Sequence, residues 1–142
     1  FENWLSDFRS KKEKKMDKQV TKGMRCTFLA HGVMTTIFAL IYLFFPVWWG
    51  NLTGCLSNQV PQVFRMFGMA MLGLAIASLL AFRETSWDKV KIVAQMESIL
   101  NILFPIVILL GLFFWGLPGI AWMYFILTSG FAIAFNVFYP RG

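Results

Sequence analysis

The chain has 142 residues, of which 58% are hydrophobic, with a mean hydropathy of +0.63 and a net charge of +6. A soluble domain of this length has too little interior to bury that much apolar surface, so the composition excludes a soluble globular protein and predicts a multi-pass membrane protein. Eight of the thirteen Lys and Arg residues lie before residue 26, and this segregation favours retention on the inner side of a membrane over nucleic-acid binding.

The N-terminal segment, residues 1–25, is predicted to form an amphipathic basic helix. Its apolar side chains follow helical spacing and share one face: Phe1, Trp4, Leu5 and Phe8. A basic run follows them. An apolar face joined to basic charge is typical of an interfacial helix on anionic lipid, and it also suits docking on an acidic partner. Both interpretations stay open, together with disorder of the segment.

Residues 26–142 are predicted to form an all-α membrane domain, a compact bundle of four transmembrane helices. The expected spans are residues 27–49, 63–82, 92–114 and 119–139. In the second connection, Thr85 with Asp88 three residues on predicts an N-cap for the third helix. The short turn "WGLPG" predicts that the third and fourth helices form a close antiparallel hairpin.

The distribution of charge predicts the orientation of the spans. Every Lys and Arg except Arg65 lies in the N-terminal segment, the second connection or the C-terminus. By the positive-inside rule, both termini face the cytoplasm, or an equivalent matrix or stroma. Arg65 then lies at the outer end of the second span, where it reaches lipid headgroups or an acidic group of a partner. Cys26 and Cys55 fall on opposite sides of the membrane, which excludes a disulfide between them within the chain.

Small residues predict how the helices pack. The second span carries Gly73, Ala77 and Ala81 at four-residue spacing, and the fourth carries Gly130 and Ala134. Such stripes let helix backbones approach closely in a membrane. The Phe residues are too numerous for the centre of so small a bundle, so many of them are expected to face lipid, pigment or partner subunits.

The third span has a polar face, although ionisable groups inside a membrane carry a high insertion cost. Glu97, Asn101 and Pro105 follow one another at intervals of four residues. Pro105 cannot donate to the carbonyl of residue 101 and is expected to bend the helix there. Polar side chains at similar depth on the other spans predict one inner-leaflet cluster to which all four helices contribute. Its predicted members are His31, Thr35, Ser78, Glu97, Asn101 and Asn136.

Three interpretations of this cluster compete. In the first, its members form interhelical hydrogen bonds with a protonated Glu97. In the second, Glu97 lies on a proton or cation path. In the third, His31, Glu97 or Asn101 binds a chlorin metal or a quinone, although the sequence predicts no particular cofactor.

Catalytic motifs are absent from the sequence. It contains no Cys-x-x-Cys, no Gly-rich phosphate loop and no Ser/His/Asp set with plausible geometry. A single histidine excludes a multi-histidine metal site within the chain. The sequence therefore predicts a protein that is not an enzyme and has no metal site.

Three segments suggest a family. They are "FFP" at the end of the first span, "FRMFGMAMLGLA" at the start of the second, and "GLPG" before the last. In these segments and in its layout the chain resembles small, uncharacterised four-span membrane proteins of the DoxX-like kind. The resemblance covers residues 27–139 and leaves out the basic tail. It implies the four-helix fold and brings no active residues.

The sequence predicts an accessory or scaffolding subunit of a larger membrane complex, because the chain lacks catalytic motifs and carries excess aromatic surface and an amphipathic tail. The predicted partners are other membrane-protein subunits, and anionic lipids at the N-terminal segment, but no nucleic acid. Two alternatives stay open. One is a small oligomeric proton- or cation-coupled transporter that uses Glu97, and the other is a pigment-, quinone- or lipid-binding membrane protein.

Overall fold

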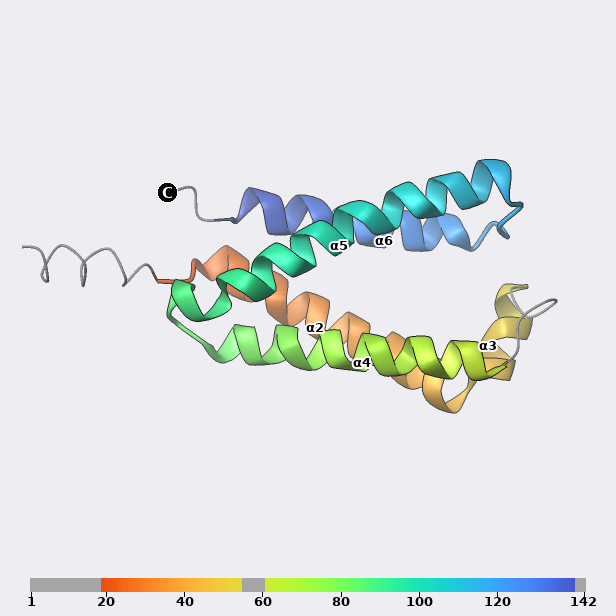
Figure 1. Ribbon diagram of the computed structural model, residues 1–142, viewed down its shortest axis with the longest axis horizontal. Helices are drawn as coiled ribbons and strands as arrows, with labels where there is room; N and C mark the ends of the chain where they lie inside the picture. The colour runs from red at the N-terminus through yellow and green to blue at the C-terminus, as the bar shows by residue number, and fades with distance from the viewer. Residues whose placement is uncertain (1–18, 55–60, 140–142) are drawn as a thin grey trace, which may run out of the picture.

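The computed structural model describes residues 19–54 and 61–139, and most of them are helical (Figure 1). This part of the chain contains no strand beyond an isolated bridge between Gln19 and Ser86, so the prediction of an all-α protein is confirmed for it. The helices in chain order are α2 (Lys22–Phe44), α3 (Pro46–Thr53), α4 (Pro61–Arg83), α5 (Trp87–Phe114) and α6 (Ala121–Val137). The predicted N-terminal amphipathic face lies outside the described residues: Phe1, Trp4, Leu5 and Phe8.

Within the described residues, α2, α4 and α5 are long and apolar enough to cross a membrane. They have 23, 23 and 28 residues. At ~1.5 Å per residue, each exceeds the hydrocarbon thickness of about 30 Å. Helix α6 is apolar but shorter, with 17 residues. Three apolar helices of this length are the signature of an integral membrane protein.

The first apolar stretch differs from its prediction because it is not one helix. Helix α2 ends at Phe44, and α3 begins at Pro46. Between them, Phe45 adopts φ −125° and ψ 40°, outside the helical region. A proline disfavours helical geometry in the residue before it and has no N–H to donate, so Pro46 ends α2 and begins α3. Gly54 then ends α3 in the left-handed region, at φ 73°.

The predicted N-cap of the third span is wrong by one residue. Helix α5 begins at Trp87, and Ser86 is its N-cap residue without a side-chain hydrogen bond. The carbonyl of Thr85 instead accepts a hydrogen bond of 2.8 Å from the backbone N–H of Val20. Thr85 therefore belongs to a connection that pairs with the segment preceding α2.

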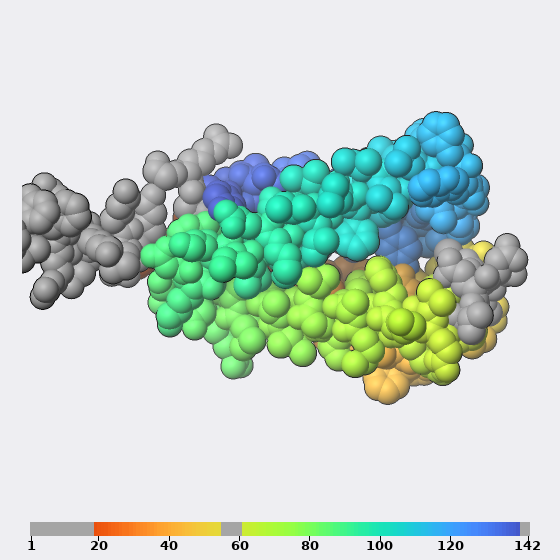
Figure 2. Space-filling view, in the orientation of Figure 1, coloured from red at the N-terminus to blue at the C-terminus, as the bar shows by residue number. Residues whose placement is uncertain are grey.

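The helices form two antiparallel hairpins, α2 with α4 and α5 with α6 (Figure 1). The hairpins converge at the end that holds Gln19, the α4–α5 connection and Tyr139. A single apolar core joins them there, made by Val20, Met24, Phe28, Ala81, Trp87, Val90, Ala94 and Phe135. Figure 2 shows the same arrangement, with α4 and α5 in contact near their connection and farther apart toward α3. The backbones of α4 and α5 are therefore close together at this end and diverge toward α3 (Figure 1 and Figure 2).

Aromatic side chains join the hairpins toward the other end. The hydroxyls of Tyr42 and Tyr124 lie 2.9 Å apart, and the indole N–H of Trp49 donates to Tyr124 Oη at 2.9 Å. The rings of Phe67 and Phe104 are 6.4 Å apart. Part of the large aromatic content thus lies between the hairpins. Other rings stay exposed, among them those of Phe44, Phe45, Phe113 and Phe114.

The predicted small-residue stripes contribute less than expected to helix packing. No heavy atom outside its own helix and neighbours would lie within 4 Å of a Cβ at Gly73 or Gly130. Close approach of α2 and α4 instead depends on Gly32, which faces Leu79, and on Gly68, which faces the backbone of Ala39. Of the stripe on α4, Ala81 does lie in the core.

Candidate functional site

The structure brings five of the six predicted cluster residues together, from three helices. Helix α2 contributes His31 and Thr35, α4 contributes Ser78, and α5 contributes Glu97 and Asn101. All five are buried, and Ser78 and Glu97 are only 0% and 1% exposed. Because His31 and Ser78 belong to one hairpin and Glu97 to the other, the cluster lies at the interface between the hairpins.

Three side chains at the centre of the cluster form a closed triangle. The hydroxyl of Ser78 donates to Glu97 Oε1 at 2.8 Å. Ser78 Oγ also lies 3.0 Å from His31 Nδ1. The triangle closes between His31 Nε2 and Glu97 Oε2, which are 3.5 Å apart. Glu97 Oε2 is nevertheless buried without a hydrogen-bond partner.

Two further polar groups border the histidine ring. Thr35 Oγ1 and Asn101 Nδ2 each lie 3.5 Å from His31 Nε2. Asn101 Nδ2 also donates to the carbonyl of Glu97 at 2.8 Å, within one turn of α5. On the remaining side, the rings of Phe131 and Phe135 pack nearly perpendicular to the imidazole, with centroids 4.9 and 5.5 Å from it. Helix α6 therefore contributes an apolar wall to the site.

The triangle brings a serine, a histidine and an acidic side chain together. It is not a nucleophile relay, in which histidine lies between the serine and the acid. Here the hydroxyl of Ser78 contacts both other groups, and the side chain has no exposed surface to offer a substrate. The arrangement is suited to holding hydrogen bonds between helices.

Three basic side chains at this end of the molecule, those of Arg25, Lys89 and Lys91, have other partners. Arg25 Nε donates to the carbonyl of Phe82 at 3.1 Å, and its guanidinium lies over the Phe82 ring. Lys89 pairs with Glu84, and Lys91 pairs with Asp88 on the same helix. In the described part of the chain, His31 is the only basic residue that forms an ion-pair contact with Glu97.

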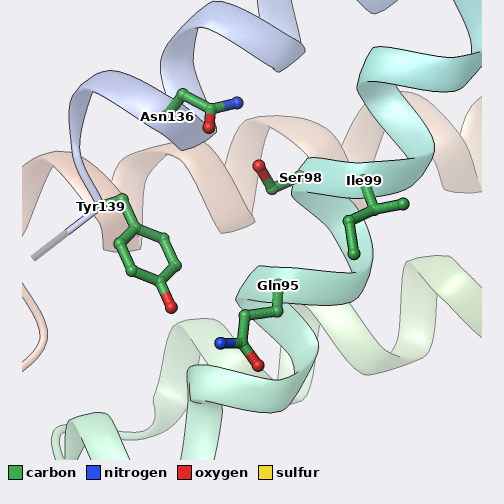
Figure 3. A pocket seen from close by; sticks show the side chains of 5 residues that line it. All are labelled: Gln95, Ser98, Ile99, Asn136 and Tyr139. Carbon is green, nitrogen blue, oxygen red and sulfur yellow. The ribbon is translucent and has the colours of Figure 1, made fainter.

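Asn136 is the predicted cluster member that the structure places elsewhere. It is exposed on α6, and its amide donates to the carbonyl of Ala132 at 2.8 Å. The reason is rotational: Phe135 and Phe131 face the core, so their neighbour Asn136 is turned outward. It lines an open groove between α5 and α6, together with Gln95, Ser98, Ile99 and Tyr139 (Figure 3).

This groove, which we call the α5–α6 groove, was not predicted from the sequence. Its signal is present in the chain as two polar pairs at helical spacing, Gln95 with Ser98 and Asn136 with Tyr139. Figure 3 shows Gln95 and Ser98 on α5, opposite Asn136 near the end of α6 and Tyr139 just beyond that end. Gln95 and Asn136 are both exposed, so two amide side chains are presented on the outside of this hairpin.

The remaining predicted residues lie away from the cluster. Helix α5 continues through Pro105, which is buried inside it. Arg65 is exposed near the start of α4 and donates to Gln62 Oε1 at 3.0 Å. Residues 19–54 and 61–139 contain no group of three His, Cys, Asp or Glu side chains that could hold a metal ion.

Fold and site together define an all-helical membrane protein with a buried polar cluster between two hairpins. Comparisons with protein-family models, with curated proteins and with solved structures find no match to the chain. The resemblance to DoxX-like proteins stays a prediction.

Proposed function

We propose that the chain crosses the membrane four times, with α6 as the fourth span and both termini on the cytoplasmic, matrix or stromal side. Helix α6 extends about 26 Å at ~1.5 Å per residue, close to the thickness of the hydrocarbon core. The described ends of the chain lie beside the α4–α5 connection, because Gln19 pairs with Ser86 and the ring of Tyr139 packs on Trp87. In the described part of the chain, the basic residues lie near the starts of α2 and α5 and at the end of α4, with Arg65 as the exception.

Labelling of the two cysteines tests this topology. Cys26 is exposed near the start of α2, at the proposed inner side, and Cys55 belongs to the proposed outer connection. A membrane-impermeant maleimide added outside sealed vesicles is expected to modify Cys55 and spare Cys26. Single-cysteine variants, Cys26→Ser and Cys55→Ser, serve as controls. Modification of Cys26 alone would reverse the orientation.

Within the membrane, we propose that the protein is an accessory or scaffolding subunit of a larger complex and not an enzyme. The α5–α6 groove carries this proposal. Gln95 lies one turn beyond Lys91, or roughly 6 Å into the membrane at ~1.5 Å per residue. Amides exposed at this depth lie where the hydrocarbon core begins and hydrogen-bonding groups become scarce, and polar side chains in this situation commonly bind another transmembrane helix. A partner helix that supplies hydrogen bonds to Gln95 and Asn136 would satisfy them.

Steric blockage of the groove tests the accessory role. Ile99 lines the groove and is 57% exposed, whereas Ile133 on α6 is 65% exposed and lies outside the residues that line it. The measurement is the amount of any subunit that co-purifies stoichiometrically with the tagged wild type in mild detergent. With tagged Ile99→Trp, this amount is expected to fall at least tenfold. Ile133→Trp, the matched control, is expected to retain it. Equal retention by both variants, or purification of the wild type without another subunit, would contradict the proposal.

The N-terminal segment adds a second contact in this proposal, with anionic lipid or an acidic subunit. Its dense basic charge supports this role. The last residues of the segment belong to the folded part of the chain: Val20 is buried in the core, and its N–H donates to the carbonyl of Thr85. A truncation that removes most of the basic charge and preserves the fold should therefore end at residue 18.

The second candidate function, a proton- or cation-coupled transporter, is favoured by the buried carboxyl group of Glu97 between the two hairpins. Proton-coupled flux into liposomes that disappears in a folded Glu97→Gln variant would support it, and absence of flux in the wild type would exclude it. A pigment-, quinone- or lipid-binding role is separated from both by native purification, because a bound chromophore or quinone would accompany the protein.

A further inference from the structure

The central triangle contains three close polar contacts, and its ordinary protonation state cannot place a hydrogen in each of them. Ser78 forms hydrogen bonds of 2.8 Å with Glu97 and 3.0 Å with His31. His31 Nε2 and Glu97 Oε2 lie 3.5 Å apart, at ion-pair distance, and Oε2 has no hydrogen-bond partner. Each contact needs one hydrogen between its two heavy atoms, because otherwise two lone pairs face each other. A serine hydroxyl supplies one hydrogen and a neutral imidazole supplies one. An ionised carboxylate supplies none, so one contact lacks its hydrogen.

This count does not depend on the tautomer of His31. If Nδ1 carries the hydrogen, it donates to Ser78, Ser78 donates to Glu97 Oε1, and the contact between Oε2 and Nε2 lacks a hydrogen. If Nε2 carries the hydrogen, the contact between Nε2 and Oε2 has one. Ser78 can then donate its single hydrogen to Glu97 or to His31, but not to both. Thr35 and Asn101 lie near Nε2, but neither provides a partner for Oε2, which has none.

We infer that Glu97, His31 and Ser78 form an intramembrane proton-binding site that holds one proton more than an ionised carboxylate and a neutral imidazole would carry. With that proton, all three contacts have a hydrogen and the site is electrically neutral. Without it, one negative charge lies buried between two hairpins. The inference goes beyond the proposed accessory role and does not depend on it.

The surroundings assign the proton to the carboxyl group of Glu97, as a hydroxyl on Oε2, which faces His31 Nε2 at 3.5 Å. The groups facing the pair are Ser78 from α4, Thr35 from α2, Asn101 from α5 and the rings of Phe131 and Phe135 from α6. None of these bears a charge. In an apolar interior a neutral acid and a neutral base avoid the desolvation of two ions, so the neutral pair is favoured over the imidazolium–carboxylate pair.

In this site, the contacts that hold the two hairpins together depend on one proton. Two contacts of the triangle, from Ser78 and from His31 to Glu97, cross from the α2–α4 hairpin to the α5–α6 hairpin. Without the proton, one of the three contacts has no hydrogen: either one of these two or the Ser78–His31 contact. It also leaves a charge at the interface. The hairpins meet there without any other ion pair to Glu97 in the described part of the chain.

Spectroscopy of the intact protein in lipid nanodiscs at neutral pH tests the inference. The chain has one histidine and four glutamates, Glu2, Glu13, Glu84 and Glu97, so selective labelling gives few signals. We expect infrared absorption from one protonated carboxylic acid per chain, lost in Glu97→Gln and retained in the matched control Glu84→Gln. Nitrogen NMR of His31 is expected to show one protonated and one unprotonated ring nitrogen.

Two other outcomes are informative. An ionised Glu97 with both nitrogens of His31 protonated would support the extra proton and move it to the imidazole. An ionised Glu97 with a neutral imidazole would overturn the inference. If Glu97→Gln does not fold, carbon NMR of glutamate-labelled wild type decides alone. A protonated glutamate signal or a doubly protonated His31 supports the site, and the absence of both excludes it.

Discussion

Replacing Glu97 with leucine is expected to destabilise the protein by about 1–3 kcal/mol, because Ser78 and His31 would be left as buried polar groups without their partner. Replacing it with glutamine should change stability by less than ~0.5 kcal/mol, which is below the net contribution of one hydrogen bond. A glutamine has an oxygen that accepts from Ser78 and an N–H that can donate to His31 Nε2. It therefore reproduces the hydrogens of a protonated glutamic acid. The measurement is the free energy of unfolding in mixed micelles, followed by circular dichroism.

The matched control for this pair is Glu84→Leu. The Glu84 side chain is 42% exposed and pairs with Lys89 at 3.1 Å, and exposed ion pairs contribute roughly 0–1 kcal/mol. Glu84→Leu should therefore lower the free energy of unfolding by less than Glu97→Leu does. Equal destabilisation by Glu97→Gln and Glu97→Leu would show that the cluster needs an ionised carboxylate, contrary to the hydrogen-bonding interpretation.

Replacing Gly68 with leucine is expected to separate α2 from α4 and to cost about 1–3 kcal/mol, as overpacking of a close contact does. A Cβ at Gly68 would lie 3.0 Å from the carbonyl oxygen of Ala39 and 3.0 Å from Tyr42 Cβ. One of these neighbours is backbone, which cannot rotate away, so the helices must move. The same unfolding measurement detects the loss, and a fluorescence or cross-linking distance between α2 and α4 would report the separation.

Gly73→Leu provides the contrast on the same helix. A Cβ there meets no heavy atom within 4 Å, and leucine has a higher helix propensity than glycine, so stability should stay equal or rise slightly. The sequence singled out Gly73 as a packing residue, whereas the structure assigns that role to Gly68. A larger loss from Gly73→Leu than from Gly68→Leu would contradict the observed α2–α4 interface.

The positions of the helices along the chain follow largely from the sequence, because apolar length and polar connections are local properties. Helix α4 covers residues 61–83, against an expected span of 63–82. The end of α2 at Phe44 was not predicted, because the apolar run continues past it and only one proline ends the helix there. Pro46 altered the backbone of Phe45, and the hydropathy of the segment carries no sign of this.

Depth within the cluster also follows from the sequence. The rise per residue of a helix is constant, so counting from the basic inner end places His31 and Glu97 at one level, and the structure brings them within 3.5 Å. Counting cannot determine which way a helix faces. Asn136 has a suitable depth but faces outward, because Phe131 and Phe135 occupy the inner face of α6.

The sequence by itself therefore determined the membrane class, the all-helical fold and the depth of the polar residues, since each depends on composition or on distance along one helix. Only the tertiary structure decided the rotation of each helix about its axis. That rotation placed Gly68 at the α2–α4 contact, turned Gly73 and Asn136 outward, and closed the triangle of Ser78, His31 and Glu97. The physical reason is that nearly every face of these helices is apolar, so periodicity alone does not distinguish the face that meets a neighbour from the face that meets lipid.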